Sequence, residues 1–106
     1  MRVLFVCGRG RARSPTAAQV FADWPGVSTD FGGVSPDADD VLSADQIEWA
    51  DLIVAMENRH RTRLSERYRA AMRGRRVVVL GVPDRYAFMA PDLVTVLRER
   101  AGPHLR

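Results

Sequence analysis

The chain contains no lysine and only one cysteine, Cys7. A single cysteine excludes an intrachain disulfide and any zinc site built from several thiolates, and it favours a reducing compartment, the cytoplasm. Long apolar segments are missing too. The longest stretch without a charged residue runs only from Ser14 to Ala22, whereas a membrane helix needs about 20 apolar residues. We therefore expect no membrane span, and no secretory signal is visible.

What remains has the composition of an ordinary globular protein. With 106 residues, 46% of them hydrophobic and 27% charged, the chain has the size of one domain, and we expect residues 1–106 to form it. The net charge of +3 is unevenly distributed. Residues 14–58 carry nine acidic side chains and no arginine, whereas residues 59–76 carry eight arginines and one acid, Glu66. The second segment is either a solvated helix face or a surface for an anionic partner.

Short apolar segments predict the strands. Three of them are rich in β-branched residues and do not alternate with polar ones, which indicates strands buried on both faces of a sheet. A fourth, more polar segment is typical of an edge strand. In chain order the predicted strands are 3–6, 27–31 (the edge strand), 52–56 and 77–80.

Four helices are predicted between and after these strands, from apolar residues at helical spacing and from capping signals. They are 14–24, with Ser14 as N-cap and Pro15 at the first helical position; 44–50, opened by a capping box of Ser43 and Gln46; 58–73; and 91–101, ended by Gly102 and Pro103.

Strands and helices alternate throughout, which favours an α/β fold: a single-domain open four-stranded parallel sheet with helices on both faces. In such a sheet, ligands bind beyond the carboxyl ends of the strands, where the strand order reverses. Functional residues are therefore expected in the loops that follow the strands, which are 7–14, 32–42, 57–58 and 81–90.

The loop after the first strand has the composition of an anion-binding loop. Gly8 and Gly10 allow the backbone to curl so that successive N–H groups point inward. The N-terminus of the following helix adds further N–H groups and the positive end of its dipole. The predicted phosphate-binding residues are Gly8, Arg9, Gly10, Arg11, Ala12 and Arg13.

Cys7 and Arg13 give this loop its predicted chemistry. A thiol at such a place ionises more readily, and the thiolate is a nucleophile. We predict that Cys7 attacks phosphorus while Arg13, whose planar guanidinium can hold two oxygens at once, stabilises the charge on the phosphoryl group. Ser14 is expected to donate a hydrogen bond to the Cys7 sulfur when the phosphocysteine is hydrolysed. This reaction needs no metal and no cofactor.

The leaving oxygen needs a general acid from a neighbouring loop. Asp84 is preferred because it follows the last strand, and parallel strands bring their carboxyl ends to one edge. Asp92 is the alternative, although the helix dipole already explains a carboxylate in the first turn of a helix. His60 shares a predicted helix face with Leu64 and is interpreted as a packed side chain without a catalytic role.

The segment from Val3 to Val20, with a Cys, five residues and Arg-Ser-Pro, resembles the amino terminus of the low-molecular-weight protein tyrosine phosphatases. The resemblance extends through the strand within Ala50–Met56 to a late Asp followed by an aromatic residue. Because the family's usual members are longer, the chain resembles a short bacterial branch. The resemblance implies a phosphotyrosine-containing protein or a small aryl phosphate as substrate. It also implies a four-stranded parallel sheet, Cys7 as nucleophile, Arg13 as phosphate ligand, Asp84 as general acid and Tyr86 as a wall of the pocket.

The sequence departs from the family pattern at three places. Gly10 stands where the family usually has Asn, and Pro83 precedes Asp84 where the family usually has Asp-Pro-aromatic. Ala12 stands where many members carry a second cysteine that can form a protective disulfide. We therefore expect Cys7 to lack reversible intramolecular protection.

Three other functions stay open on the sequence alone. An arsenate reductase uses a similar loop but normally needs two further cysteines in the same chain. A phosphocysteine carrier, resembling the sugar-transport IIB proteins, has a loop that lacks the arginine. A non-enzymatic protein could bind a phosphoprotein, or less favourably a nucleic acid, through the arginines of residues 59–76.

Overall fold

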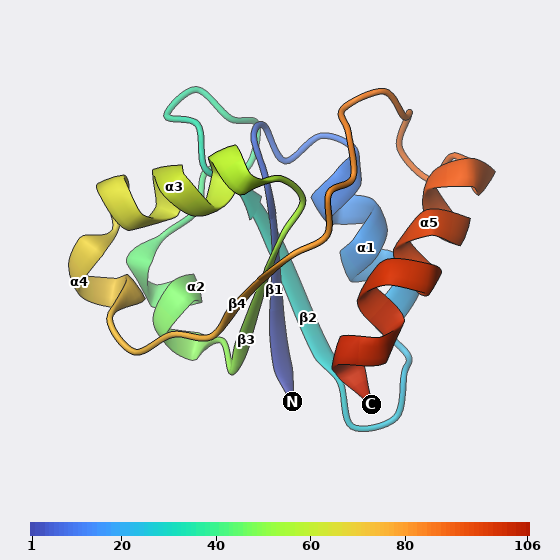
Figure 1. Ribbon diagram of the computed structural model, residues 1–106, viewed down its shortest axis with the longest axis horizontal. Helices are drawn as coiled ribbons and strands as arrows, with labels where there is room; N and C mark the ends of the chain where they lie inside the picture. Colours follow the sequence, from blue (N-terminus) through green and yellow to red (C-terminus); the bar gives the residue numbers. More distant parts are fainter.

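The computed structural model describes all 106 residues and is built on one parallel sheet with the strand order β2-β1-β3-β4 (Figure 1). The three strand pairings are all parallel. Every carboxyl end therefore lies at the same edge of the sheet, the upper edge in Figure 1. The strands are β1 (Arg2–Cys7), β2 (Ser28–Gly33), β3 (Leu52–Ala55) and β4 (Val77–Val79). The predicted fold class is confirmed.

The central strand β1 is apolar on both faces, and successive side chains point to opposite sides. Val3 and Phe5 belong to one core cluster, together with residues of α1 and α5, whereas Leu4 and Val6 belong to a second. Figure 1 shows the corresponding layers, with α1 and α5 on one side of the sheet and α2, α3 and α4 on the other. These helices are α1 (Arg13–Phe21), α2 (Ala44–Trp49), α3 (Asn58–Arg67), α4 (Arg69–Met72) and α5 (Pro91–Ala101).

The single helix predicted over 58–73 is wrong, because the chain leaves the helical conformation at Tyr68, which has φ −127° and ψ 40°. The hydroxyl group of Tyr68 donates to the carbonyl of Leu42 at 2.8 Å. The short helix α4 then packs Ala71 into the same core cluster as Ile47 of α2. Leu64, Tyr68 and Met72 keep the four-residue spacing of a helix across this break. The periodicity of apolar residues therefore does not reveal the break.

The remaining differences concern exposure and the ends of elements. β2 extends through Gly33, two residues beyond its predicted end at 31. β4 is predicted to be buried but is only partly so, because it pairs with β3 alone and forms the edge of the sheet. The first helix ends at Phe21, three residues earlier than expected. Gly102 does not stop the last helix: its φ of −47° is helical, and the chain continues as a 3-10 helix over Gly102–Leu105. None of the helices has the length and apolar character of a membrane span.

Candidate active site

The loop after β1 is oriented by the segment that follows β2. Three N–H groups of that segment donate at 2.9 Å to three consecutive carbonyls of the loop, namely Val34 to Cys7, Ser35 to Gly8 and Asp39 to Arg9. Because a peptide N–H points opposite to the carbonyl of the same peptide unit, the next N–H groups of the loop turn away from this segment. The N–H groups of Gly8, Arg9, Arg11 and Ala12 have no backbone acceptor. Successive free N–H groups in such a curl make an anion nest.

Two glycines allow this close approach. Gly10 has φ +71°, a left-handed conformation that glycine adopts readily. At Gly33, the last residue of β2, a Cβ atom would lie 2.6 Å from the carbonyl carbon of Arg9 and 2.7 Å from the carbonyl oxygen of Gly8. The end of β2 therefore touches the loop backbone directly, which no local pattern in the sequence indicates.

The prediction that Ser14 caps the first helix is wrong. α1 begins one residue earlier, at Arg13, and Ala12 occupies the N-cap position. Ser14 lies fully buried in the first turn, where its Oγ is 3.0 Å from the Sγ of Cys7 and 3.5 Å from the carbonyl oxygen of Gly32. Its hydroxyl group therefore contacts Cys7 and Gly32, on other elements, and makes no capping hydrogen bond to its own helix. The Cys7 sulfur also accepts from the N–H of Gly10 at 3.3 Å.

The guanidinium group of Arg13 is held from behind by residues that follow two other strands. The side chain is only 3% exposed, and its Nη1 donates to the carbonyl of Val82 at 2.9 Å and lies 3.1 Å from Oε1 of Glu57. Its Nε lies 3.8 Å from Oδ1 of Asp84. Neither Nε nor Nη2 makes a hydrogen bond. The edge of the guanidinium formed by Nε and Nη2 is therefore available to donate to two oxygens of one ligand.

Glu57 and His60 belong to this arrangement, although sequence reasoning did not select them. Burial tends to raise the pKa of Glu57, but the hydrogen bond from Arg59 and the charge of Arg13 outweigh it and leave that pKa below its usual value. The carboxylate is thus a charged partner for Arg13. Only its place directly after a buried strand, in the expected loop 57–58, could have indicated it.

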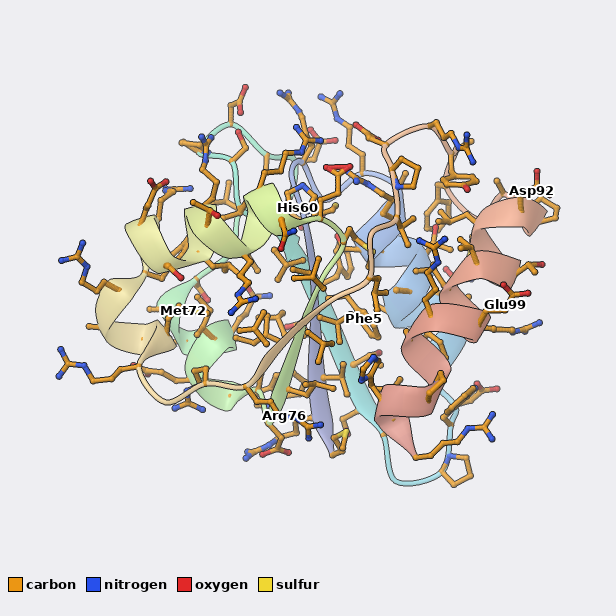
Figure 2. All side chains as sticks on the ribbon, in the orientation of Figure 1. Phe5, His60, Met72, Arg76, Asp92 and Glu99 are labelled. Carbon is orange, nitrogen blue, oxygen red and sulfur yellow. The ribbon has the colours of Figure 1, made fainter.

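His60 is buried, as predicted, with 2% of its surface exposed, but it also lines the cavity described below. Its Nδ1 accepts the N–H of Glu57 at 3.1 Å. Burial, together with the nearby charge of Arg13, lowers the pKa of His60 from 6.5 to about 4. The neutral ring therefore carries its proton on Nε2, which has no hydrogen-bond partner. Figure 2 shows His60 near the start of α3, in the upper part of the view where the carboxyl ends of the strands lie.

The loop that carries Asp84 is fixed at both ends. The N–H of Val82 donates to the carbonyl of Met56 at 2.8 Å, and the N–H of Met89 donates to Oγ1 of the buried Thr16 at 2.9 Å. Between these points Asp84 faces the cavity, with its side chain 63% exposed. Asp92 does not line the cavity and lies at the outer end of α5 (Figure 2).

A cavity of about 690 Å³ lies over the loop and contains Cys7, Asp84 and Tyr86 among its lining residues. Two of the arginines that line it are paired with exposed carboxylates, Arg9 with Asp37 at 3.1 Å and Arg11 with Asp39 at 2.6 Å. Asp84 is the only acidic side chain in the lining, which gives the cavity a positive potential suited to an anion. The five arginines of the lining are Arg9, Arg11, Arg13, Arg59 and Arg63.

The sequence matches no protein-family model and no curated protein. Solved structures are similar over nearly the whole chain. YwlE arginine phosphatase from Geobacillus stearothermophilus is 23% identical with a TM-score of 0.70, covering 98% of this chain and 92% of that one. Wzb from Vibrio vulnificus, solved with benzylphosphonate, is 20% identical with a TM-score of 0.78, covering 97% and 95%. A low-molecular-weight protein tyrosine phosphatase from T. tengcongensis is 23% identical with a TM-score of 0.69, covering 96% and 93%. The chain therefore shares the fold of solved low-molecular-weight protein tyrosine phosphatases.

Proposed function

We propose that the protein is a cysteine-dependent phosphomonoester hydrolase, and specifically a protein tyrosine phosphatase. The observation that carries the proposal is the placement of the Cys7 sulfur at the floor of an anion nest, 3.0 Å from the hydroxyl oxygen of Ser14 and 3.3 Å from the peptide nitrogen of Gly10. The buried guanidinium of Arg13 belongs to a residue that lines the same cavity as Cys7. The fold shared with YwlE and Wzb supports the same conclusion.

In the first step of this mechanism, the Cys7 thiolate attacks phosphorus and the bond from phosphorus to the leaving oxygen breaks. Asp84 gives its proton to that oxygen, because it is the carboxyl group that faces the cavity. The free edge of Arg13 and the loop N–H groups bind the equatorial oxygens, where charge spreads in the transition state. Glu57 and Val82 keep the guanidinium in place.

In the second step, a water molecule attacks the phosphocysteine and gives its proton to the Asp84 carboxylate. The bond between sulfur and phosphorus breaks, and Ser14 donates a hydrogen bond to the departing thiolate. The products are inorganic phosphate and the free Cys7 thiolate. The cycle uses only side chains and backbone groups of this chain and requires Cys7 to stay reduced, as in the cytoplasm.

Phosphotyrosine-containing proteins and small aryl phosphates are the proposed substrates. Tyr86 offers an aromatic wall, and benzylphosphonate, the ligand in the Wzb structure, is an aromatic phosphonate. Phosphoarginine, suggested by the name of YwlE, fits less well, because its guanidinium would meet the arginines of the cavity wall. A phosphocysteine carrier is disfavoured because Arg13 stabilises the transition state of hydrolysis.

Turnover of p-nitrophenyl phosphate by wild type, Asp84→Asn and Asp92→Asn tests the assignment of the acid. General acid catalysis contributes about 10²–10⁴-fold, so Asp84→Asn should lower kcat by about that factor while Asp92→Asn leaves it unchanged. The opposite result would transfer the role to Asp92. Matched phosphotyrosine and phosphoarginine peptides test the substrate class, and faster turnover of the phosphoarginine peptide would contradict it.

A further inference from the structure

The arginines of residues 59–76 divide into two groups. Some serve the fold: Arg67 donates to the carbonyl of Val34, and Arg75 donates to the carbonyls of Glu48 and Ala50 at 2.9 and 3.2 Å. Others make no side-chain hydrogen bond or ion pair and lie exposed on the helices or directly after them. We call four of these the α3–α4 arginine face: Arg61, Arg63, Arg69 and Arg73.

This face is continuous with the proposed active site. Arg61, Arg69 and Arg73 line a second hollow, of about 690 Å³, whose only acidic residue is Glu66. Thr62 lines both this hollow and the cavity over Cys7, and Arg63 lines that cavity as well. In Figure 2, His60 and Met72 mark the two ends of the helical segment along which the path runs. A positive surface therefore leads from the cavity along α3 to α4.

We propose that the α3–α4 arginine face binds an acidic segment of the phosphoprotein substrate, next to its phosphorylated residue. The inference rests on the proposed function, because it takes that residue to sit over Cys7. The ten residues of α3 rise by about 15 Å, and an extended peptide covers this distance in about five residues. The acidic side chains that matter therefore lie within about six residues of the phosphorylated one.

The composition of the face fits carboxylates better than a nucleic acid. Unpaired bases are bound by stacking on aromatic side chains, and no aromatic residue lines the second hollow. Tyr68 is engaged instead, since its hydroxyl group donates to Leu42 and the guanidinium of Arg67 lies 5.4 Å from its ring centroid. Exposed guanidinium groups alone are sufficient to bind carboxylates.

Three phosphotyrosine peptides test the proposal. One carries four Glu residues within six positions on the N-terminal side, one carries them on the C-terminal side, and one carries Gln at those places. Four exposed ion pairs of ordinary strength correspond to about a tenfold lower KM at low salt. We expect one acidic peptide to show this advantage with wild type and to lose most of it with the triple variant Arg61→Gln, Arg69→Gln, Arg73→Gln, which keeps Arg63 because that residue lines the cavity.

A charge-matched control removes three exposed arginines elsewhere, in Arg76→Gln, Arg98→Gln, Arg106→Gln. This control should keep most of the advantage, and both triple variants should hydrolyse p-nitrophenyl phosphate like wild type. Equal KM values for all three peptides, or equal losses in the two triple variants, would overturn the docking proposal while the hydrolase proposal stands.

Fluorescence anisotropy of the labelled acidic peptide keeps the docking test independent of catalysis. If wild type does not hydrolyse p-nitrophenyl phosphate, the proposed function fails, and the effect of the triple variant on peptide binding still decides the docking proposal. An RNA oligonucleotide of equal charge serves as competitor. Displacement of the peptide by RNA at a much lower concentration than by unlabelled peptide would assign the face to nucleic acid and overturn the proposal.

Discussion

Replacing Gly33 with alanine tests whether the end of β2 positions the phosphate-binding loop. The added Cβ would lie 2.6 Å from the carbonyl carbon of Arg9 and 2.7 Å from the carbonyl oxygen of Gly8. The same Cβ would lie 2.6 Å from the Cβ of Ala38. Carbon atoms in favourable contact are about 3.5–4.0 Å apart, so the end of β2 and the loop backbone must separate by about 1 Å, and Ala38 must shift as well. Overpacking of this kind costs about 1–3 kcal/mol of stability. We also expect the KM for p-nitrophenyl phosphate to rise, because the N–H groups of the nest move with the loop.

Gly26→Ala is the matched control. Gly26 has φ +75°, but a Cβ there would meet no atom within 4 Å. Alanine in this conformation costs about 1–2 kcal/mol without touching the loop. Urea unfolding should therefore show a loss of stability in both variants, whereas only Gly33→Ala should weaken substrate binding and competitive inhibition by inorganic phosphate. Wild-type values of KM and phosphate affinity in Gly33→Ala would show that the end of β2 does not position the loop.

Contacts of Thr16, His60 and Cys7 predict the effects of a substitution, of pH and of oxidation. Thr16→Val removes the acceptor for the Met89 N–H; kcat for p-nitrophenyl phosphate should fall several-fold as the Asp84 loop loosens, and an unchanged kcat would mean that this contact does not position the acid. The pKa of His60 is lowered to about 4, so the native state binds fewer protons than the unfolded state between pH 6.5 and 4 and loses stability as the pH falls through this range. The loss is at most about 1.4 kcal/mol per pH unit; urea unfolding should show a shallower pH dependence in His60→Gln, and an identical one would contradict the lowered pKa. Peroxide should inactivate the enzyme without thiol-reversible protection, since Cys7 is the only cysteine and has no partner for an intramolecular disulfide; mass spectrometry should show sulfinic or sulfonic acid on Cys7, and full recovery of activity on adding thiol would refute the prediction.

Local patterns in the sequence predict the strands, the parallel sheet and the loop from Cys7 to Arg13, because each depends on residues close together in the chain. Ser14 shows the limit of such rules: it has the residue type of an N-cap, but the Cys7 sulfur lies 3.0 Å from its hydroxyl oxygen. The sequence places Glu57 in an expected functional loop but does not show that it contacts Arg13, and it gives no sign of the role of Gly33. Both residues reach the loop after β1 because β3 and β2 lie on either side of β1. Strand order depends on the whole fold, so no local pattern in the sequence predicts it.

Whether Cys7 is the nucleophile of a phosphatase is decided by hydrolysis of p-nitrophenyl phosphate by wild type and Cys7→Ser, compared in the presence of a metal chelator and across pH 4 to 8. The placement of the Cys7 sulfur within reach of Ser14 and Gly10 predicts metal-independent turnover by wild type. It also predicts that Cys7→Ser abolishes this turnover, because the hydroxyl group is a far weaker nucleophile than a thiolate. Absence of turnover by wild type over the whole pH range, or turnover retained by Cys7→Ser, would contradict the account.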